Sequence, residues 1–169
     1  MNKPIVSIIM GSTSDLPVME KACKLLDEMQ VPFEVNALSA HRTPDAVEEF
    51  ARTAKDRGIK VIIAGAGMAA ALPGVIAAST TLPVIGVPIK GMLDGLDAML
   101  SIIQMPPGIP VATVGINAAQ NAAILAIEMI ALSDATLAQR LAVYKGGLRA
   151  KIEKANKDLA DIKYEFKCN

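Results

Sequence analysis

The most distinctive chemical stretch of the chain is Ser39-Ala40-His41-Arg42-Thr43-Pro44, which contains the only histidine among 169 residues. Histidine titrates near neutrality, and Arg42 places a fixed positive charge beside it. An isolated His-Arg pair is more often a solvated surface pair than a site. Here, however, a strand pattern ends just before the pair, and Thr43-Pro44 is typical of a helix start. The neighbouring loops decide what the pair does.

Two other loops also follow predicted strands. Gly11-Ser12-Thr13-Ser14-Asp15 follows an apolar run that begins at Ile5, and Gly65-Ala66-Gly67 follows the run that begins at Val61. Ligands bind at the carboxyl ends of strands in open parallel sheets, near the point where the strand order reverses. With the strand order 2-1-3-4-5, all three loops would share one edge of the sheet.

Together these loops predict a site for a phosphorylated small molecule. Ser12, Ser14 and Ser39 supply hydroxyl groups, and Arg42 supplies a guanidinium that can donate two parallel hydrogen bonds. Asp15 can accept hydrogen bonds from sugar hydroxyls. Each loop alone has an ordinary explanation in turn and capping chemistry, so the prediction depends on their combination with His41.

The glycine-rich stretch is also a loose match to the Gly-x-Gly-x-x-Gly/Ala pattern of dinucleotide-binding proteins. It follows the third predicted strand rather than the first, and no acidic residue lies about 20 positions further on to hold a ribose. We therefore interpret the glycines as positions where the backbone can approach a flat ligand closely.

The elements that must position these loops alternate along the chain. Strands are predicted over residues 5–10, 33–38, 61–64, 84–87 and 111–114. Helices are predicted between them, over about 69–79 and 91–104 among others, and Asn117 is the expected cap of a helix that runs to about Leu132. This alternation predicts an α/β protein with a parallel sheet covered on both faces, in a single catalytic domain over residues 1–169.

The C-terminal extension, about residues 134–165, has a different pattern. Apolar residues from Leu137 to Ile162 recur at steps of three or four and form one stripe. The stripe predicts a helix of roughly 45 Å, which is longer than the sheet it would cover. Gly146-Gly147 is an expected kink.

Composition excludes several classes of partner. Lysine and arginine number 17, and aspartate and glutamate number 17, so there is no electrostatic basis for nucleic acid or membrane binding. The uncharged run from Val61 to Ile89 is long enough for a membrane span, but glycines and prolines divide it into shorter pieces. So few charges in the middle of the chain predict burial between subunits, in a homo-oligomer. Two cysteines and one histidine predict a reducing, cytoplasmic location and no metal site.

The chain resembles class I N5-carboxyaminoimidazole ribonucleotide mutase, the family of the phosphoribosylaminoimidazole carboxylase catalytic subunit. The matching motifs run in family order over roughly residues 5–130. They are Met10-Gly-Ser-Thr-Ser-Asp15, Ser39-Ala-His-Arg-Thr-Pro44, Ala64-Gly-Ala-Gly67, Leu72-Pro-Gly74, Gln104-Met-Pro106, Gly108-Ile-Pro-Val111 and Asn121-Ala-Ala123. The histidine motif is the most specific of them.

The resemblance implies a flavodoxin-like three-layer α/β/α sandwich, assembled as a homo-octamer, without a metal or an organic cofactor. It implies that His41 is the general acid and base. It also implies a set of substrate-binding residues, which comprises Ser12, Asp15, Ser39, Arg42, Gly65, Ala66, Gly67 and Leu72. Many members have Gly-Gly-Ala-Ala-His-Leu-Pro-Gly where this chain has Gly67-Met-Ala-Ala-Ala-Leu-Pro-Gly74. Met68 and Ala71 therefore leave this chain without a second histidine.

The implied activity is that of an isomerase of purine biosynthesis. It converts N5-carboxyaminoimidazole ribonucleotide to 4-carboxy-5-aminoimidazole ribonucleotide by carboxylate transfer. A direct carboxylase, which would use free carbon dioxide and aminoimidazole ribonucleotide, is the alternative within the same fold. A non-catalytic nucleotide- or flavin-binding module is a further alternative, although no tryptophan and only two tyrosines are available to stack on a flavin.

Overall fold

A computed structural model describes residues 3–168 and shows a five-stranded parallel sheet with the strand order β2-β1-β3-β4-β5. This is the predicted order, and the order reverses at β1 and β3. The strands are β1 (Val6–Met10), β2 (Phe33–Ala37), β3 (Val61–Gly67), β4 (Val84–Ile89) and β5 (Ala112–Thr113).

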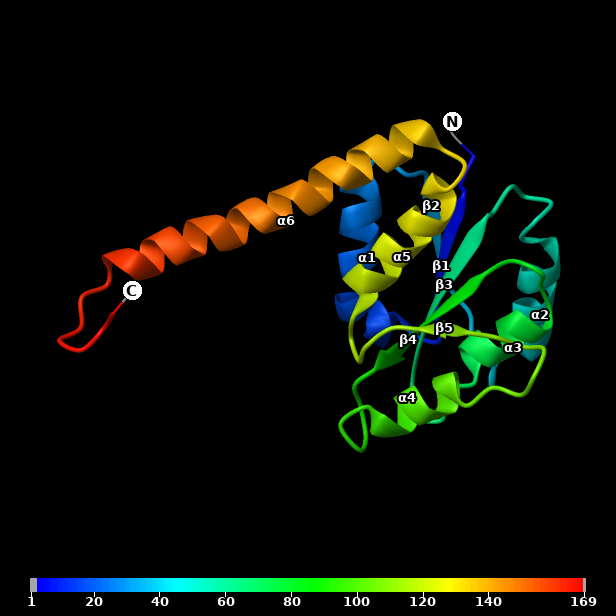
Figure 1. The fold of residues 1–169 in the computed structure, drawn as a ribbon. Helices are drawn as coiled ribbons and strands as arrows, with labels where there is room; N and C mark the ends of the chain where they lie inside the picture. Colours follow the sequence, from blue (N-terminus) through cyan, green and yellow to red (C-terminus); the bar gives the residue numbers. More distant parts are fainter. Residues whose placement is uncertain (1–2, 169) are drawn as a thin grey trace.

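Helices cover both faces of the sheet, so the predicted three-layer α/β/α sandwich is confirmed (Figure 1). One core cluster joins the sheet to α1 and α5, and the other joins it to α2, α3 and α4. The helices are α1 (Leu16–Glu28), α2 (Pro44–Thr53), α3 (Leu72–Ala78), α4 (Leu96–Ile103), α5 (Ala119–Ala131) and α6 (Ala135–Asp161), and a short 3-10 turn, η1 (Thr13–Asp15), precedes α1.

The inner strands explain the continuous apolar runs of the sequence. Every residue of β1 and β4 is buried, as are the first six residues of β3. A strand covered on both faces must be apolar on both faces, so alternation is lost. Ser7, the one buried polar side chain among residues 3–168, donates a hydrogen bond to Glu34 Oε1 at 2.9 Å, which satisfies its hydroxyl.

The strand register places the three candidate loops together. Met10, the last residue of β1, pairs with Ala37 at the end of β2 and with Gly65 in β3. β1 and β2 end at the same level and β3 runs two residues further, to Gly67, so the three parallel strands deliver their following loops to the same edge of the sheet. The expected convergence of the loops is therefore a direct consequence of the register.

Two helices begin later than expected because of backbone conformation. α4 begins at Leu96 rather than Gly91, since Leu93, Asp94 and Gly95 all have positive φ angles that a right-handed helix cannot contain. α3 begins at Leu72 rather than about Ala69, because residues 68–71 form a turn with a hydrogen bond from the Ala71 N–H to the Ala69 carbonyl at 2.7 Å.

The predicted cap at Asn117 is wrong. Ala118 occupies the cap position of α5, and Asn117 has a φ of 58° just before it. The Asn117 side chain instead accepts a hydrogen bond from the Lys90 N–H at 2.8 Å, so it joins the loop after β4 to the loop before α5. Asparagine is a common residue type both at helix caps and in loops, where its side chain bonds to backbone groups. Only the fold shows which of these roles Asn117 has.

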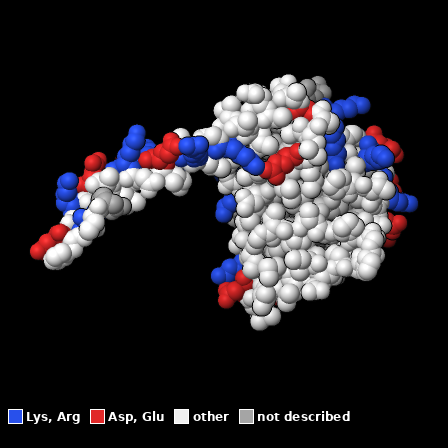
Figure 2. All heavy atoms as spheres, viewed as in Figure 1, with Lys and Arg blue, Asp and Glu red and all other residues white. Residues whose placement is uncertain are grey.

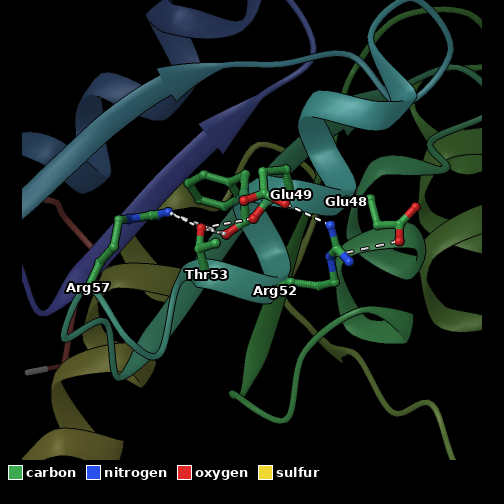
Figure 3. A network of polar contacts seen from close by, with 6 residues as sticks. Glu48, Glu49, Arg52, Thr53 and Arg57 are labelled. Atoms are coloured by element: carbon green, nitrogen blue, oxygen red, sulfur yellow. Dashed lines mark hydrogen bonds and ion pairs between the residues drawn. The ribbon is translucent and has the colours of Figure 1, made fainter.

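A polar network ties α2 to the edge strand β2. Arg57, just beyond α2, donates to Thr53 Oγ1 at 2.8 Å and lies 3.0 Å from the Glu34 carboxylate of β2. On the exposed side of α2, Figure 3 shows a second set of ion pairs, which joins Arg52 to Glu48 and Glu49. These exposed pairs contribute little to stability, whereas the half-buried Arg57–Glu34 pair holds the helix against the strand.

The C-terminal helix α6 is present, as expected, and it divides into two halves. In its inner half Leu137 is buried, and Leu141 and Tyr144 pack against the core cluster of α1 and α5. In its outer half Leu148 and Ile152 are exposed. Figure 1 shows this half extending away from the α/β body. The helix is continuous through the two glycines and ends at Asp161, so it is about 40 Å long, slightly shorter than predicted.

Candidate functional site

The loops after β1, β2 and β3 enclose one pocket of about 150 Å³. Of the residues that the sequence assigns to the site, the structure brings together all but Gly65. The pocket is lined by Gly11, Ser12, Ser14, Asp15, the segment Ser39 to Arg42 and the segment Ala66 to Leu72. The two polar loops form one wall of the site, and the small apolar residues after β3 form the other.

Gly65 lies outside the lining because the glycine-rich stretch is part of β3. Gly65 pairs with Val87 and Gly67 with Ile89, so β3 is three residues longer than predicted. A Cβ added at Gly65 would lie 2.5 Å from Met19 Sδ of α1. This glycine therefore allows α1 to pack closely on the sheet, and only Ala66 and Gly67 reach the pocket.

The loop that carries His41 is held by its neighbours. Arg42 donates to the Gly11 carbonyl through Nη2 at 3.0 Å and to Ser39 Oγ through Nε at 3.3 Å. These bonds join the loop after β2 to the loop after β1. Within residues 3–168, Arg42 Nη1 has no hydrogen-bond partner, and this nitrogen remains available to an anion.

Thr43 closes the same loop rather than capping α2 with its side chain. It occupies the cap position of α2 without a side-chain capping bond. Its hydroxyl accepts from the Ser39 N–H at 2.9 Å and lies 3.1 Å from the Ser39 carbonyl, to which it can donate. His41 therefore sits, exposed, at the tip of a turn that is fixed at both ends.

The loop after β1 orients Ser12 toward the pocket. Ser12 Oγ accepts from the Ser14 N–H at 3.3 Å and from Ser14 Oγ at 3.0 Å. Because both contacts use Ser12 as the acceptor, its own hydroxyl proton is free to be donated to a ligand. Ser14, expected as an equal donor, instead has its proton directed to Ser12.

Asp15 is half-buried beside these donors. Burial raises the pKa of its carboxyl above the usual value, while a backbone hydrogen bond from Ser12 and the nearby Arg42 guanidinium lower it. Burial is the largest of these effects. The titratable side chains in the described lining of the pocket are Asp15, His41 and Arg42. Of these three residue types, histidine is the one that most often acts as a general acid or base.

The wall after β3 includes residues that the sequence-based assignment omitted. Met68, Ala69, Ala70 and Ala71 all line the pocket, in addition to the expected Leu72. The signal that could have identified them was their position, since the whole turn between β3 and α3 faces the two polar loops. Ala71 contributes a small apolar side chain to the lining.

Other site types are absent from the described part of the chain. Among residues 3–168, no group of three His, Cys, Asp or Glu side chains could hold a metal ion. No helix of the described residues is both long enough and apolar enough to cross a membrane.

Sequence and structure comparisons agree with this geometry. The AIR carboxylase family matches residues 5–151. An N5-carboxyaminoimidazole ribonucleotide mutase from Pyrococcus abyssi is 58% identical over 86% of this chain and 84% of its own length. A phosphoribosylaminoimidazole carboxylase from Candida glabrata is 51% identical over 98% of this chain, but this chain spans only 29% of it.

The fold comparison leads to the same family. PurE from Treponema denticola superposes with a TM-score of 0.83 at 30% identity, over 92% of this chain and 98% of that one. The family match over residues 5–151 includes all five strands and the three loops of the pocket. The chain therefore belongs to the AIR carboxylase family.

Proposed function

We propose that this protein is an isomerase of purine biosynthesis that converts N5-carboxyaminoimidazole ribonucleotide to 4-carboxy-5-aminoimidazole ribonucleotide. Relatives with the mutase name are 50–58% identical over most of the chain. The observation that carries the proposal is the convergence of His41, Arg42 and the serines on one pocket. We place the activity in a single domain, residues 1–169, and in the cytoplasm.

In this proposal the polar wall binds the ribose phosphate. The free Nη1 of Arg42 and the hydroxyls of Ser12 and Ser39 donate to the phosphate, and Asp15 accepts from a ribose hydroxyl. Ala66, Gly67 and Leu72 form the apolar wall, against which the flat aminoimidazole ring lies. A charged group and a flat heterocycle on the same ligand match these two walls.

His41 then serves as the general acid and base. The bond between the carboxylate carbon and the exocyclic nitrogen breaks, its electron pair stays on nitrogen, and His41 supplies the proton that nitrogen accepts. Ring carbon 4 attacks the released carbon dioxide, and His41 removes the proton from that carbon. One histidine suffices, because each cycle returns it to its starting state. The carboxylate moves without a net change of redox state, so the proposal includes no metal or organic cofactor.

The direct carboxylase remains a second candidate for a specific reason. Fungal proteins named phosphoribosylaminoimidazole carboxylase match this chain at 51–60% identity, which is as high as the mutases. The two activities differ in their carbon source, since only the carboxylase takes carbon dioxide from solution.

A spectroscopic assay distinguishes the two activities. The enzyme is offered N5-carboxyaminoimidazole ribonucleotide or aminoimidazole ribonucleotide, each with and without bicarbonate. We expect turnover of the first substrate without bicarbonate. Turnover that requires bicarbonate and aminoimidazole ribonucleotide would replace the mutase assignment with the carboxylase.

We also propose that the protein works as a homo-oligomer, and as an octamer by resemblance. Figure 2 shows few charged side chains on the face formed by α4, β5 and the segments around them. The exposed apolar residues of this region are Met92, Leu93, Leu96, Leu100 and Ile103. Such a patch is unusual on a monomer. Light scattering at micromolar concentration tests the proposal, and a monomer would contradict it.

A further inference from the structure

Met68, the first residue after β3, has a backbone conformation that an L-residue rarely adopts. Its φ is 54°, in the left-handed region, and its carbonyl accepts from the Ala70 N–H at 2.8 Å to close a tight turn. Glycine would adopt this conformation without the steric cost that a Cβ brings. Residues in this region cluster at active sites and ligand contacts, so a residue of this kind beside a pocket is a candidate for a function.

Packing within the described chain does not provide that use. The Met68 side chain is 63% exposed and belongs to neither core cluster, whereas its neighbours Ala70 and Leu72 are 3% and 2% exposed. The strain is therefore not offset by burial among residues 3–168.

The position of Met68 suggests what the side chain does. It lines the same pocket as Ser12, His41 and Arg42 and belongs to the apolar part of the lining. The pocket of about 150 Å³ is smaller than the roughly 300–1,000 Å³ of most small-molecule sites, so a bound ribonucleotide would extend beyond it. A flexible exposed thioether at the rim can cover the part that extends, and methionine sulfur makes favourable contacts with aromatic rings.

We infer that Met68 is a substrate-covering residue, whose thioether packs on the aminoimidazole ring and limits the escape of carbon dioxide between its release and its recapture. This inference rests on the proposed function. If carbon dioxide escapes, the enzyme yields aminoimidazole ribonucleotide, with the exocyclic nitrogen protonated and no bond formed at carbon 4. The amount of aminoimidazole ribonucleotide formed per turnover therefore measures how well the Met68 side chain retains carbon dioxide.

The test compares three variants in the full-length protein. Met68→Ala removes the side chain and keeps the Cβ, Met68→Gly removes both, and Met68→Leu keeps the bulk. We expect the alanine and glycine variants to raise KM for N5-carboxyaminoimidazole ribonucleotide about 2- to 10-fold, the range of a lost sulfur–aromatic contact. They should also release a larger share of each turnover as aminoimidazole ribonucleotide, above the rate without enzyme. The leucine variant keeps the bulk but lacks the sulfur, so it should restore the by-product share and recover KM only in part.

Thermal unfolding separates strain from function, because the glycine variant should have a higher Tm than the alanine variant while sharing its KM. Leu132→Ala, at a 91% exposed position of the α5–α6 turn, is the matched control and should change neither KM nor the by-product. An active wild-type enzyme whose alanine and glycine variants keep the wild-type KM and by-product share would overturn the inference. Met68 variants that dissociate, as measured by light scattering, but keep the wild-type KM would also overturn it. A wild-type enzyme inactive on this substrate would overturn the proposed function and the inference with it.

Discussion

The loops around the pocket and the outer half of α6 are both exposed, but they are held in different ways. Ser39, Arg42 and Thr43 are held by hydrogen bonds within their own loop, and Arg42 also donates to the Gly11 carbonyl of the loop after β1. Beyond Tyr144, which accepts from Gln120 Nε2 at 3.0 Å, and Lys145, which pairs with Glu128, α6 has little contact with the body.

The comparison shows that exposure has two meanings in this protein. At the pocket, exposed polar groups are preorganised, and their free donors point to a ligand. Along the outer half of α6, exposed apolar groups continue a stripe whose inner members are buried, which is typical of a surface that a second copy covers. Four predictions test this distinction, from the largest expected effect to the smallest.

An introduced carboxylate should have different effects in the inner and outer halves of the α6 stripe. Leu137→Asp places a carboxylate at a position that is 1% exposed, so we expect a loss of at least about 3 kcal/mol in the free energy of unfolding. Leu148→Asp with Ile152→Asp should leave the protomer folded by circular dichroism, while light scattering shows a smaller assembly. Equal destabilisation by both changes would mean that the outer half packs on its own protomer.

His41→Asn tests whether the loop does chemistry or only binds. The amide can replace one ring hydrogen bond but cannot carry a proton, so we expect kcat to fall by about 10²-fold or more. Substrate binding, measured by calorimetry, should survive, because Arg42, Ser12 and Asp15 remain. A variant within a few-fold of the wild-type kcat would remove His41 from the mechanism and favour a binding module.

Arg42→Ala tests the phosphate site. We expect substrate binding to weaken by roughly 2–4 kcal/mol, because the change removes a charged donor to a doubly charged group. Ser12→Ala is the control of matched location and should cost only about 1 kcal/mol, as the loss of one neutral donor. Calorimetry that finds Arg42→Ala binding unchanged would place the phosphate elsewhere.

Asp15→Asn should have the smallest effect on stability and a definite pH dependence. Burial raises the pKa of Asp15 in the folded protein above the usual 3.8, so the native state binds more protons between these two pKa values. The wild type therefore loses stability as pH rises through that window. At pH 7 the asparagine variant should be more stable by less than about 0.5 kcal/mol, since the carboxyl is partly solvated. Thermal unfolding should show that the stability difference between the variant and the wild type vanishes below pH 3.8. A difference that grew below this pH would mean that folding lowers the pKa of Asp15 instead of raising it.

Much of the fold was predictable from local patterns. The continuous apolar runs identified the inner strands, because a strand that is buried on both faces needs apolar side chains on both. Ser39 to Pro44, taken together with the loops after two other strands, indicated a loop that the structure places at the pocket. Helix starts were less predictable, since the positive φ angles of Leu93 and Asp94, which delay α4, come from ordinary residue types.

The sequence by itself determined the chemistry available at the site, because residue type decides which groups can donate, accept or carry charge. Only the tertiary structure decided which of those groups meet. The strand register at Met10 brings the three loops to one edge of the sheet. Gly65 packs under Met19 instead of lining the pocket, and the Ser14 hydroxyl donates to Ser12. The positive φ angle and the exposure of Met68 are likewise properties that only the structure shows. The physical reason is that contacts between distant segments depend on register and packing, which no local spacing specifies.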